Sequence, residues 1–365
     1  MRQVAGITPE ALLEHLPAAL DGSGPALLPG DSPGPAGVLA PNEDSPHDPT
    51  AVLVRTSGST GEPKEVLLAA SALRASAMAT HTRLGGPGRW LLATPARFIG
   101  GIQVLVRSLV AGFDPVVMDL SSGFRAEAFA ERCLELLSLP GRHYTALVPT
   151  QLARLLAGPA REALAALDGI VLGGAPLSPE LRAAAEGLPI VSAYGMSETA
   201  SGCVYDGVPL DGVNVRLVDS LVAISGPVLA RGYRGRPDLT AKSFVDGWFV
   251  TSDLGRFTGG RLEILGRADD VINTGGVKVP AAAVQRLLEQ HVDAACVVAL
   301  DDPEWGQIVA AAVVGPDADV DGLRQAVRDS LGAPAVPKVL RVIDELPLTG
   351  PGKVDRIAVR RYLTG

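Results

Sequence analysis

Thr56-Ser57-Gly58-Ser59-Thr60-Gly61-Glu62-Pro63-Lys64 is the stretch that decides the fold of this 365-residue chain. It lies between two apolar runs, Ala51–Arg55 and Val66–Leu68, which have the composition of short strands. Glycines let a backbone turn its N–H groups toward an anion, hydroxyls donate further hydrogen bonds, and a lysine adds positive charge. The stretch therefore predicts a phosphate-binding loop between two strands.

Two other interpretations of this loop are less specific. The spacing differs from the G-x-x-x-x-G-K-[ST] loop of P-loop NTPases, and a strand rather than a helix is predicted after Lys64. An ordinary polar turn would also contain Ser, Thr and Gly. The complete string Thr-Ser-Gly-Ser-Thr-Gly-x-Pro-Lys resembles the phosphate loop of the adenylate-forming superfamily, which contains acyl- and aryl-CoA synthetases, luciferases and peptide-synthetase adenylation domains.

Composition argues against several other classes of protein. The formal net charge is −8, with 40 acidic and 32 basic residues, whereas a nucleic-acid binder needs a basic face. No uncharged apolar run reaches the ~18 residues that cross a bilayer, and no signal-peptide pattern begins the chain. The three cysteines and five histidines are scattered, without disulfide or metal-ligand spacing. A cytoplasmic protein without membrane insertion or nucleic-acid partner is expected.

Short apolar strands alternate with amphipathic helices between residues 51 and 193. Strands are expected at 51–55, 90–94, 115–120, 144–148, 169–172 and 190–193, and helices at 71–83, 102–111, 125–137, 151–156 and 179–186. This alternation predicts a largely parallel sheet covered by helices on both faces. Residues 22–49, which are rich in Gly, Pro, Asp and Ser, predict an irregular surface segment.

The pattern changes after residue 200. Two hairpins are expected around residues 213–225 and 248–265, followed by a compact α+β pattern over residues 280–343. We therefore predict an α/β protein. Its large N-terminal domain, residues 1–266, has parallel sheets covered by helices and a β-rich subdomain, and a small α+β C-terminal domain spans residues 267–365.

Further motifs of the adenylate-forming superfamily follow in order. Gly173–Leu177 resembles its adenine-side loop, and Tyr194–Thr199 resembles its Y-G-x-[ST]-E-T segment. Thr251–Gly255 resembles T-G-D-x-[GA], with Ser252 in place of glycine, and Gly266–Asp270 resembles the hinge. Pro347–Lys353 matches the late P-x-T-x-x-G-K loop. The segment 232–237, with a threonine at position 240, also fits.

This resemblance implies roles for individual residues. Phosphate would be bound by Thr56, Ser57, Gly58, Ser59, Thr60, Gly61 and Lys64, and adenine by Gly174, Ala175, Pro176, Tyr194 and Gly195. Asp253 and Arg267 would bind the ribose. Glu198 would hold Mg²⁺ and Thr199 a phosphate, and with Lys353 they would form the catalytic set. The small domain would turn about Asp269, and Gly275, Gly276 and Lys278 would contact coenzyme A.

The same resemblance implies a reaction in two steps. A carboxylate attacks the α-phosphate of ATP to form an acyl-adenylate, and the thiol of coenzyme A then displaces AMP. Lys353 would bridge the carboxylate and the α-phosphate, with Mg²⁺ offsetting phosphate charge. Rotation at Asp269 would withdraw Lys353 before the second step.

The identity of the acid depends on weaker signals. The phosphate loop begins about fifty residues into the chain, which predicts an N-terminally trimmed large domain like that of the compact o-succinylbenzoate:CoA ligases of menaquinone synthesis. Residues 95–112 also resemble theirs, although many members have histidine where Phe98 stands. Such an acid has two carboxylates, so Arg97 or Arg107 would neutralise the second one. A surface charge on a helix is an equally good interpretation of Arg107.

Other functions stay open at this point. The chain could be another aryl- or acyl-CoA ligase, and a carrier-protein loader is less favoured because no carrier domain follows. It could also be a nucleotide-binding module that has lost catalysis, although such a module would not need Lys353. A homodimer is expected only from the general frequency of such assemblies.

Overall fold

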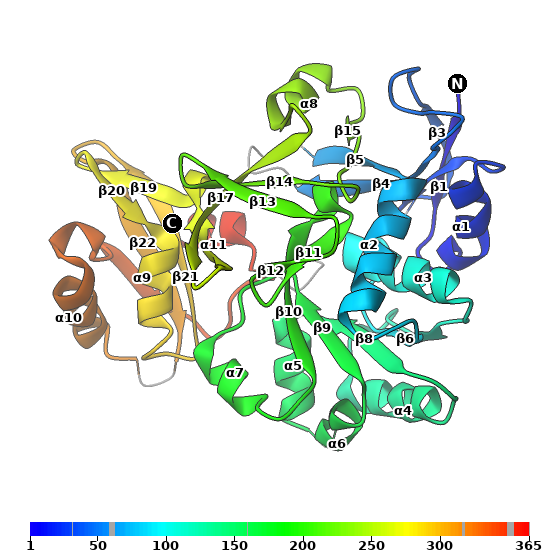
Figure 1. The fold of residues 1–365 in the computed structure, drawn as a ribbon. Coiled ribbons are helices and arrows are strands. Elements are labelled where there is room, and N and C mark those ends of the chain that lie inside the picture. The colour runs from blue at the N-terminus through cyan, green and yellow to red at the C-terminus, as the bar shows by residue number, and fades with distance from the viewer. Residues whose placement is uncertain (31, 58–62, 159, 316–317, 349–353, 365) are drawn as a thin grey trace. The chain divides into compact units, whose positions relative to one another are not determined.

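A computed structural model describes residues 1–30, 32–57, 63–158, 160–315, 318–348 and 354–364. The chain divides into two compact units (Figure 1). The first contains Met1–Arg216 and Ala223–Val250, and the second contains Leu217–Val222 and Thr251–Gly365. The boundaries between these units fall inside strands rather than at a linker. The predicted domain boundary between residues 266 and 267 therefore stays a prediction. No helix in the described residues is both long and apolar enough to span a bilayer.

The first sheet carries the strands that flank the predicted phosphate loop. Its order is β15-β5-β4-β2-β1-β3. These strands are β1 (Gln3–Ile7), β2 (Ala26–Pro29), β3 (Gly34–Val38), β4 (Thr50–Ser57), β5 (Pro63–Ala69) and β15 (Gly232–Tyr233). Helix α1 (Leu12–Asp21) connects the parallel strands β1 and β2. The irregular segment predicted for residues 22–49 is therefore wrong in part, because β2 is buried in the sheet despite its Gly- and Pro-rich flanks.

The second sheet confirms the alternation of strands and helices predicted from residue 90 onward, whereas the strand predicted at 51–55 is β4 of the first sheet and pairs antiparallel with β5. Its order is β12-β11-β10-β9-β8-β6-β7. The strands are β6 (Arg89–Leu92), β7 (Val116–Val117), β8 (His143–Leu147), β9 (Gly169–Gly173), β10 (Ile190–Met196), β11 (Ser201–Tyr205) and β12 (Val208–Pro209). The pairs from β7 through β10 are parallel, and β11 and β12 are antiparallel additions at the edge.

Helix α2 precedes β6, and helices α3 to α7 alternate with the strands that follow. They are α2 (Ala70–Arg83), α3 (Ile99–Ala111), α4 (Ala126–Leu137), α5 (Pro149–Leu156), α6 (Arg161–Ala165) and α7 (Pro179–Ala184). One core packs α4, α5 and α6 against the sheet through buried residues such as Phe129, Leu152, Leu164 and Ile170. Because parallel strands need crossover connections, the helices lie against the sheet and leave the carboxyl ends of the strands for loops.

A third sheet has the order β13-β14-β17-β16, with β18 paired to β17. Its strands are β13 (Asn214–Val218), β14 (Leu221–Ser225), β16 (Phe244–Val245), β17 (Trp248–Thr258) and β18 (Arg261–Arg267), and α8 (Pro237–Ser243) precedes β16. Both hairpins expected after residue 200 are therefore present.

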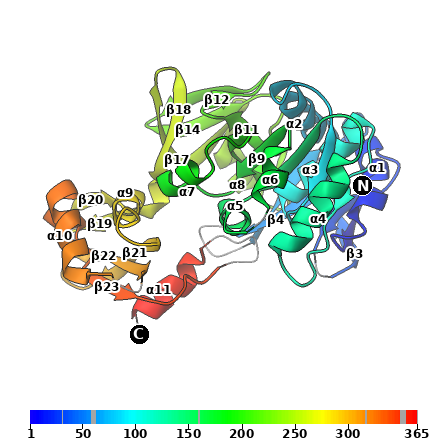
Figure 2. The ribbon, with the colours of Figure 1, turned by 90° about the horizontal axis from the view of Figure 1, so that it is seen from below.

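The last sheet belongs to the second unit and has the order β20-β19-β22-β21, with β23 paired to β22. Its strands are β19 (Val271–Thr274), β20 (Val277–Pro280), β21 (Ala294–Asp302), β22 (Gly306–Val314) and β23 (Val339–Val342), and its helices are α9 (Ala281–Leu288), α10 (Val320–Leu331) and α11 (Arg356–Thr364). Alternate residues of β21 face opposite sides of the sheet: Val297 packs with α9 and α10, whereas Val298 packs with α11. Figure 2 shows α9 and α11 on different sides of β21. This layered α+β arrangement and the sheets of the first unit confirm the predicted α/β class.

Candidate active site

The two described ends of the predicted phosphate loop lie in neighbouring strands, β4 and β5, which pair as an antiparallel hairpin. Thr56 pairs with Lys64 and Ser57 pairs with Pro63 across the two antiparallel strands. The expectation that a strand follows Lys64 is therefore confirmed. The predictions for Gly58, Ser59, Thr60, Gly61 and Lys353 concern positions outside the described residues.

Lys64 and Glu198 both contact the side chain of Tyr233. The ammonium nitrogen of Lys64 lies 5.1 Å from the centroid of the Tyr233 ring. The Tyr233 hydroxyl donates a hydrogen bond of 2.9 Å to Oε1 of Glu198. Burial, the charge of Glu198 and this hydrogen bond raise the pKa of Tyr233, whereas an interaction with the Ser243 side chain acts in the opposite direction. The hydroxyl therefore keeps its proton.

Thr199 has a different environment from the one expected of a phosphate ligand. The residue is fully buried in the short 3-10 turn Ser197–Thr199. Its hydroxyl donates to Ser201 O (2.8 Å) or Met196 O (3.1 Å) and accepts from the Met196 N–H at 3.0 Å. These bonds shape the turn that presents Glu198, so the predicted phosphate contact of Thr199 stays a prediction.

The two segments predicted to surround adenine lie at the carboxyl ends of neighbouring parallel strands. Gly173, the last residue of β9, pairs with Ala193 of β10, so Gly174-Ala175-Pro176 follows β9 directly beside Tyr194-Gly195, which are still part of β10. A Cβ on Gly195 would lie 2.2 Å from the carbonyl oxygen of Ser201 on β11. Only glycine therefore fits between these strands, and Gly195 lets β11 approach the predicted adenine segment.

Asp253, Arg267 and Asp269 form a charged cluster in the second unit. Asp253 and Arg267 are paired across β17 and β18, and Nη1 of Arg267 donates to Oδ1 of Asp253 at 3.4 Å. Arg267 also binds both oxygens of Asp269, through Nε at 2.8 Å and Nη2 at 2.7 Å. The structure thus brings the two residues predicted for the ribose together with the predicted hinge residue.

Gly275 and Gly276 form the two-residue turn between β19 and β20. Their φ angles are +56° and +82°, which match a turn with both central residues left-handed. A Cβ on Gly275 would also lie 2.6 Å from the ring of Trp305. Turn geometry and close packing therefore explain both glycines, and the predicted contacts of Gly275, Gly276 and the exposed Lys278 with coenzyme A stay predictions.

The candidates for the acid site lie at opposite ends of one helix. Arg97 and Phe98 precede α3 and are half-buried, and the guanidinium carbon of Arg97 lies 5.0 Å from the Phe98 ring centroid. Arg107 lies in the last turns of α3 and is fully buried. Its guanidinium carbon lies 4.8 Å from the Trp90 ring centroid, and Nη2 lies 3.5 Å from the Tyr205 hydroxyl. The interpretation of Arg107 as a surface charge is therefore wrong.

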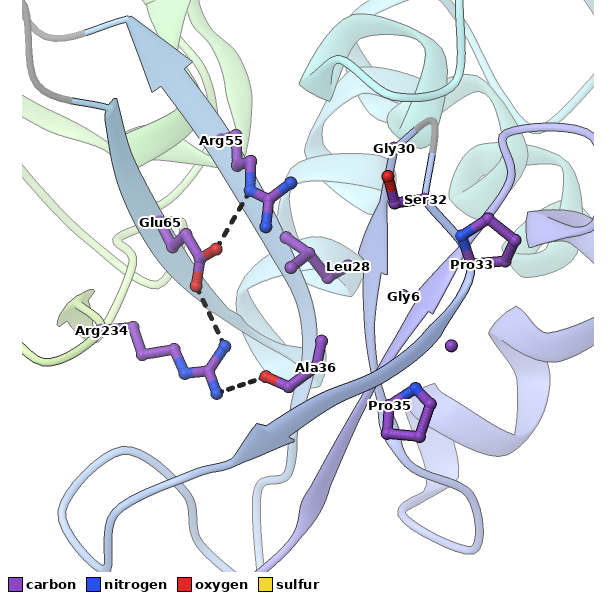
Figure 3. A pocket seen from close by; sticks show the side chains of 11 residues that line it. Gly6, Leu28, Gly30, Ser32, Pro33, Pro35, Ala36, Arg55, Glu65 and Arg234 are labelled. Carbon is purple, nitrogen blue, oxygen red and sulfur yellow. Dashed lines mark hydrogen bonds and ion pairs between the residues drawn. The ribbon is translucent and has the colours of Figure 1, made fainter.

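The opposite face of the β4–β5 hairpin carries a cavity of about 290 Å³. Glu65 accepts hydrogen bonds from Nε of Arg55 (3.1 Å) and Nη1 of Arg234 (3.0 Å), and Arg234 also donates to Ala36 O at 2.8 Å (Figure 3). Since successive strand residues point to opposite faces, Arg55 and Glu65 point away from Thr56 and Lys64. The described residues that line this cavity are not those predicted to bind a ligand.

Tyr233 is the residue to which the motifs alone assigned no role. Its segment, 232–237, was recognisable only as a fit to the superfamily. The hydrogen bond to Glu198 joins residues 35 positions apart, so no local pattern reveals it. The spacing from Gly232 to Thr240 was the available signal, because these two residues pack against each other.

Two family models match this chain. The model of the AMP-binding enzymes matches residues 10–233, and that of the AMP-binding enzyme C-terminal domain matches residues 287–353. A probable 2-succinylbenzoate–CoA ligase of Mycobacterium tuberculosis is 45% identical over 378 aligned residues, which cover 99% of this chain and 97% of that protein. A feruloyl-CoA synthase of Amycolatopsis is 32% identical, over an alignment that covers 90% of this chain and 74% of that enzyme.

Solved structures have the same fold. The amide bond synthetase McbA from Marinactinospora thermotolerans matches with a TM-score of 0.77 and 28% identity, covering 98% of this chain and 79% of that one. The o-succinylbenzoate CoA synthetase from Bacillus subtilis, in complex with its acyl-adenylate intermediate, matches with a TM-score of 0.75 over 95% of this chain and 80% of its own. Its identity of 24% supports the fold alone. The chain therefore belongs to the family of AMP-binding enzymes.

Proposed function

We propose that this chain is an AMP-forming ligase that activates 2-succinylbenzoate with ATP and transfers it to coenzyme A. The observation that carries the substrate is the 45% identity with the probable 2-succinylbenzoate–CoA ligase over almost the whole of both chains. The arrangement of Lys64, Tyr233 and Glu198 supports the nucleotide chemistry, because a cation and a carboxylate at one end of the hairpin suit phosphates and a metal ion.

The first step joins the acid to AMP. A carboxylate oxygen of the acid attacks the α-phosphorus of ATP, and the bond from that phosphorus to the bridging oxygen breaks, releasing pyrophosphate. Lys64 and the N–H groups of the hairpin loop would hold the leaving phosphates. Lys353 would bring the acid and the α-phosphate together, a role assigned from its motif.

A magnesium ion fits the described residues of this site. Glu198 is half-buried, its carboxylate is already held on one oxygen by Tyr233, and Mg²⁺ is commonly bound by one or two carboxylates with substrate phosphates and water. When bound, the ion would offset charge on the phosphate oxygens. Asp253 would accept hydrogen bonds from the ribose hydroxyls, with Arg267 beside it.

The second step makes the thioester. The sulfur of coenzyme A attacks the acyl carbon, AMP leaves, and the thiol proton passes to the surroundings. The small domain, residues 267–365, would turn about Asp269 relative to the large domain, residues 1–266, and bring the Gly275–Gly276 turn to the thiol arm. Arg267 is hydrogen-bonded to Asp269, so this bond must break or Arg267 must move with Asp269 when the small domain turns.

A second carboxylate on the acid needs a cationic partner. Arg97 is the stronger of the two candidates, since it is half-buried before the start of α3, whereas Arg107 is fully buried among Trp90 and Tyr205.

We also propose that the protein is cytoplasmic and forms a homodimer, the most frequent homo-oligomer. Light scattering on the purified protein tests the dimer.

An exchange assay tests the proposed reaction directly. Incorporation of labelled pyrophosphate into ATP is measured with 2-succinylbenzoate, ferulate, benzoate and short aliphatic acids, followed by thioester formation with coenzyme A. We expect exchange with 2-succinylbenzoate at the lowest acid concentration. Exchange with ferulate alone would favour the second candidate, a feruloyl-CoA synthase-like activity, which the 32% identity with that enzyme supports. Absence of exchange with every acid would leave a nucleotide-binding module.

The Lys353→Ala variant separates the two steps. It should abolish pyrophosphate exchange but still form thioester from supplied acyl-adenylate and coenzyme A. Equal loss of both steps would contradict the role proposed for Lys353.

A further inference from the structure

The Tyr233 side chain is fixed between two groups that the proposed reaction uses. The residue is 4% exposed, its hydroxyl donates to Glu198 Oε1 at 2.9 Å, and one face of its ring lies toward the Lys64 ammonium group. An ionised carboxylate can only accept hydrogen bonds, so the tyrosine must be the donor. This bond leaves the orientation of the Glu198 carboxylate dependent on Tyr233.

The same segment also holds the backbone of Glu198. The Ala230 N–H donates to the carbonyl oxygen of Glu198 at 2.9 Å, and the next N–H, that of Arg231, donates to Leu67 O of β5 at 2.9 Å. Glu198 is therefore held at its backbone by Ala230 and at its side chain by Tyr233. The segment joins Glu198 to the strand that begins beside the phosphate loop.

Tyr233 itself has little freedom to move. Its N–H donates to Oγ1 of Thr240 at 2.9 Å. Gly232 has a φ of +141°, and a Cβ there would lie 2.3 Å from the Thr240 methyl group. The Phe244 ring packs edge-on at 5.9 Å between centroids. Because the backbone and the ring are both fixed, the hydroxyl defines a fixed point for the Glu198 carboxylate.

We infer that Tyr233 is a positioning residue for the nucleotide site: its hydroxyl orients the Glu198 carboxylate toward the metal ion, and its ring sets the place of Lys64. This inference rests on the proposed function, since it assigns Tyr233 an action through Glu198. A carboxylate that is free to rotate loses conformational freedom when it binds a metal ion. It therefore binds the ion more weakly than a carboxylate whose orientation is already fixed by a hydrogen bond.

Tyr233→Phe tests the hydroxyl, because phenylalanine keeps the ring against Lys64 and Phe244. Binding of a fluorescent ATP analogue is measured by titration with and without Mg²⁺, in the absence of acid. We expect the apparent Mg²⁺ concentration for half-maximal binding to rise about tenfold, as for loss of a hydrogen bond to a charged group. Binding without Mg²⁺ should stay within about twofold of wild type. An unchanged Mg²⁺ dependence would overturn the inference.

Tyr144→Phe is the matched control. Tyr144 is also buried, and its hydroxyl donates to Leu84 O and Gly86 O, away from Glu198. This variant loses a buried hydroxyl and some stability but should keep the wild-type Mg²⁺ dependence. The same shift in both variants would mean that general loosening, rather than the bond to Glu198, causes the effect.

A double-mutant cycle with Glu198→Gln separates positioning from packing. If Tyr233 acts through the carboxylate, Tyr233→Phe should change the Mg²⁺ dependence about tenfold in the wild type and less than about twofold in the Glu198→Gln background. Full additivity would overturn the inference. A wild-type protein whose nucleotide binding and pyrophosphate exchange do not respond to Mg²⁺ would instead overturn the proposed function itself.

Discussion

Arg267 binds both carboxylate oxygens of Asp269, through Nε at 2.8 Å and Nη2 at 2.7 Å, while its remaining nitrogen lies 3.4 Å from Asp253. The hydrogen bonds to Asp269 are the largest cause that raises the pKa of Arg267, and burial opposes them. The planar guanidinium of Arg267 serves both carboxylates at once. The proposed ribose ligand and the proposed hinge therefore share one cation.

Arg267→Lys should weaken nucleotide binding, because an ammonium group cannot form the two parallel hydrogen bonds to Asp269 together with the one to Asp253. We expect KM for ATP to rise about tenfold with a smaller change in kcat. Arg256→Lys is the matched control, since Arg256 pairs with Glu263 across the same two strands but is 63% exposed. Steady-state kinetics of both variants provide the test, and equal effects would contradict a specific role for Arg267.

Stability should fall on acidification because of His81. Trp90 donates its indole N–H to Nε2 of His81 at 3.2 Å, so that nitrogen must be unprotonated. Burial, and then the charge of Arg107, lower the pKa of His81 from 6.5 to about 4. Between these values the unfolded chain takes up a proton that the folded chain does not, so stabilisation present above pH 6.5 is lost as pH falls toward 4.

The expected loss between pH 7 and pH 5 is about 2 kcal/mol in the free energy of unfolding. Urea unfolding of wild type and His81→Gln at both pH values measures it. Glutamine keeps an acceptor for Trp90 but does not titrate, so the variant should lose about 2 kcal/mol less than wild type between these pH values. The same pH effect in both proteins would show that other groups are responsible.

Arg97 and Arg107 should respond differently to replacement by methionine. Nε and Nη1 of Arg107 are buried without a hydrogen-bond partner among the described atoms, so removing this charge should leave the free energy of unfolding unchanged or raised by about 1 kcal/mol. KM for the acid should stay near wild type. Arg97→Met should instead raise KM for 2-succinylbenzoate at least about tenfold. A rise in KM with Arg107→Met alone would exchange the two assignments.

Gly195→Ala should destabilise the protein by about 2 kcal/mol or more, because the new methyl group meets the Ser201 carbonyl oxygen at 2.2 Å. Gly100→Ala is the control, since it lies in α3 with no heavy atom within 4 Å of an added Cβ. Alanine there should stabilise the helix by about 0.5–1 kcal/mol. Thermal unfolding of the two variants should therefore shift in opposite directions.

Much of the fold follows from patterns within a few residues. Apolar strands alternating with amphipathic helices predicted the parallel second sheet from residue 90 to 193, because each period places one face in the core, but they did not reveal that the strand at 51–55 belongs to a different sheet. The phosphate-loop string predicted the hairpin of β4 and β5. β2 was missed because its four buried residues lie between glycines and prolines, and only parallel pairing to β1 makes them a strand.

The sequence by itself determined the class of protein and the identity of most candidate residues, since each motif is a local arrangement of glycines, hydroxyls and charges. Only the tertiary structure decided which of them interact. The bond from Tyr233 to Glu198, that from Arg267 to Asp253 and that from Arg107 to Tyr205 join residues 35, 14 and 98 positions apart. Such contacts depend on which strands become neighbours, a choice made by burial of the whole chain rather than by any single segment.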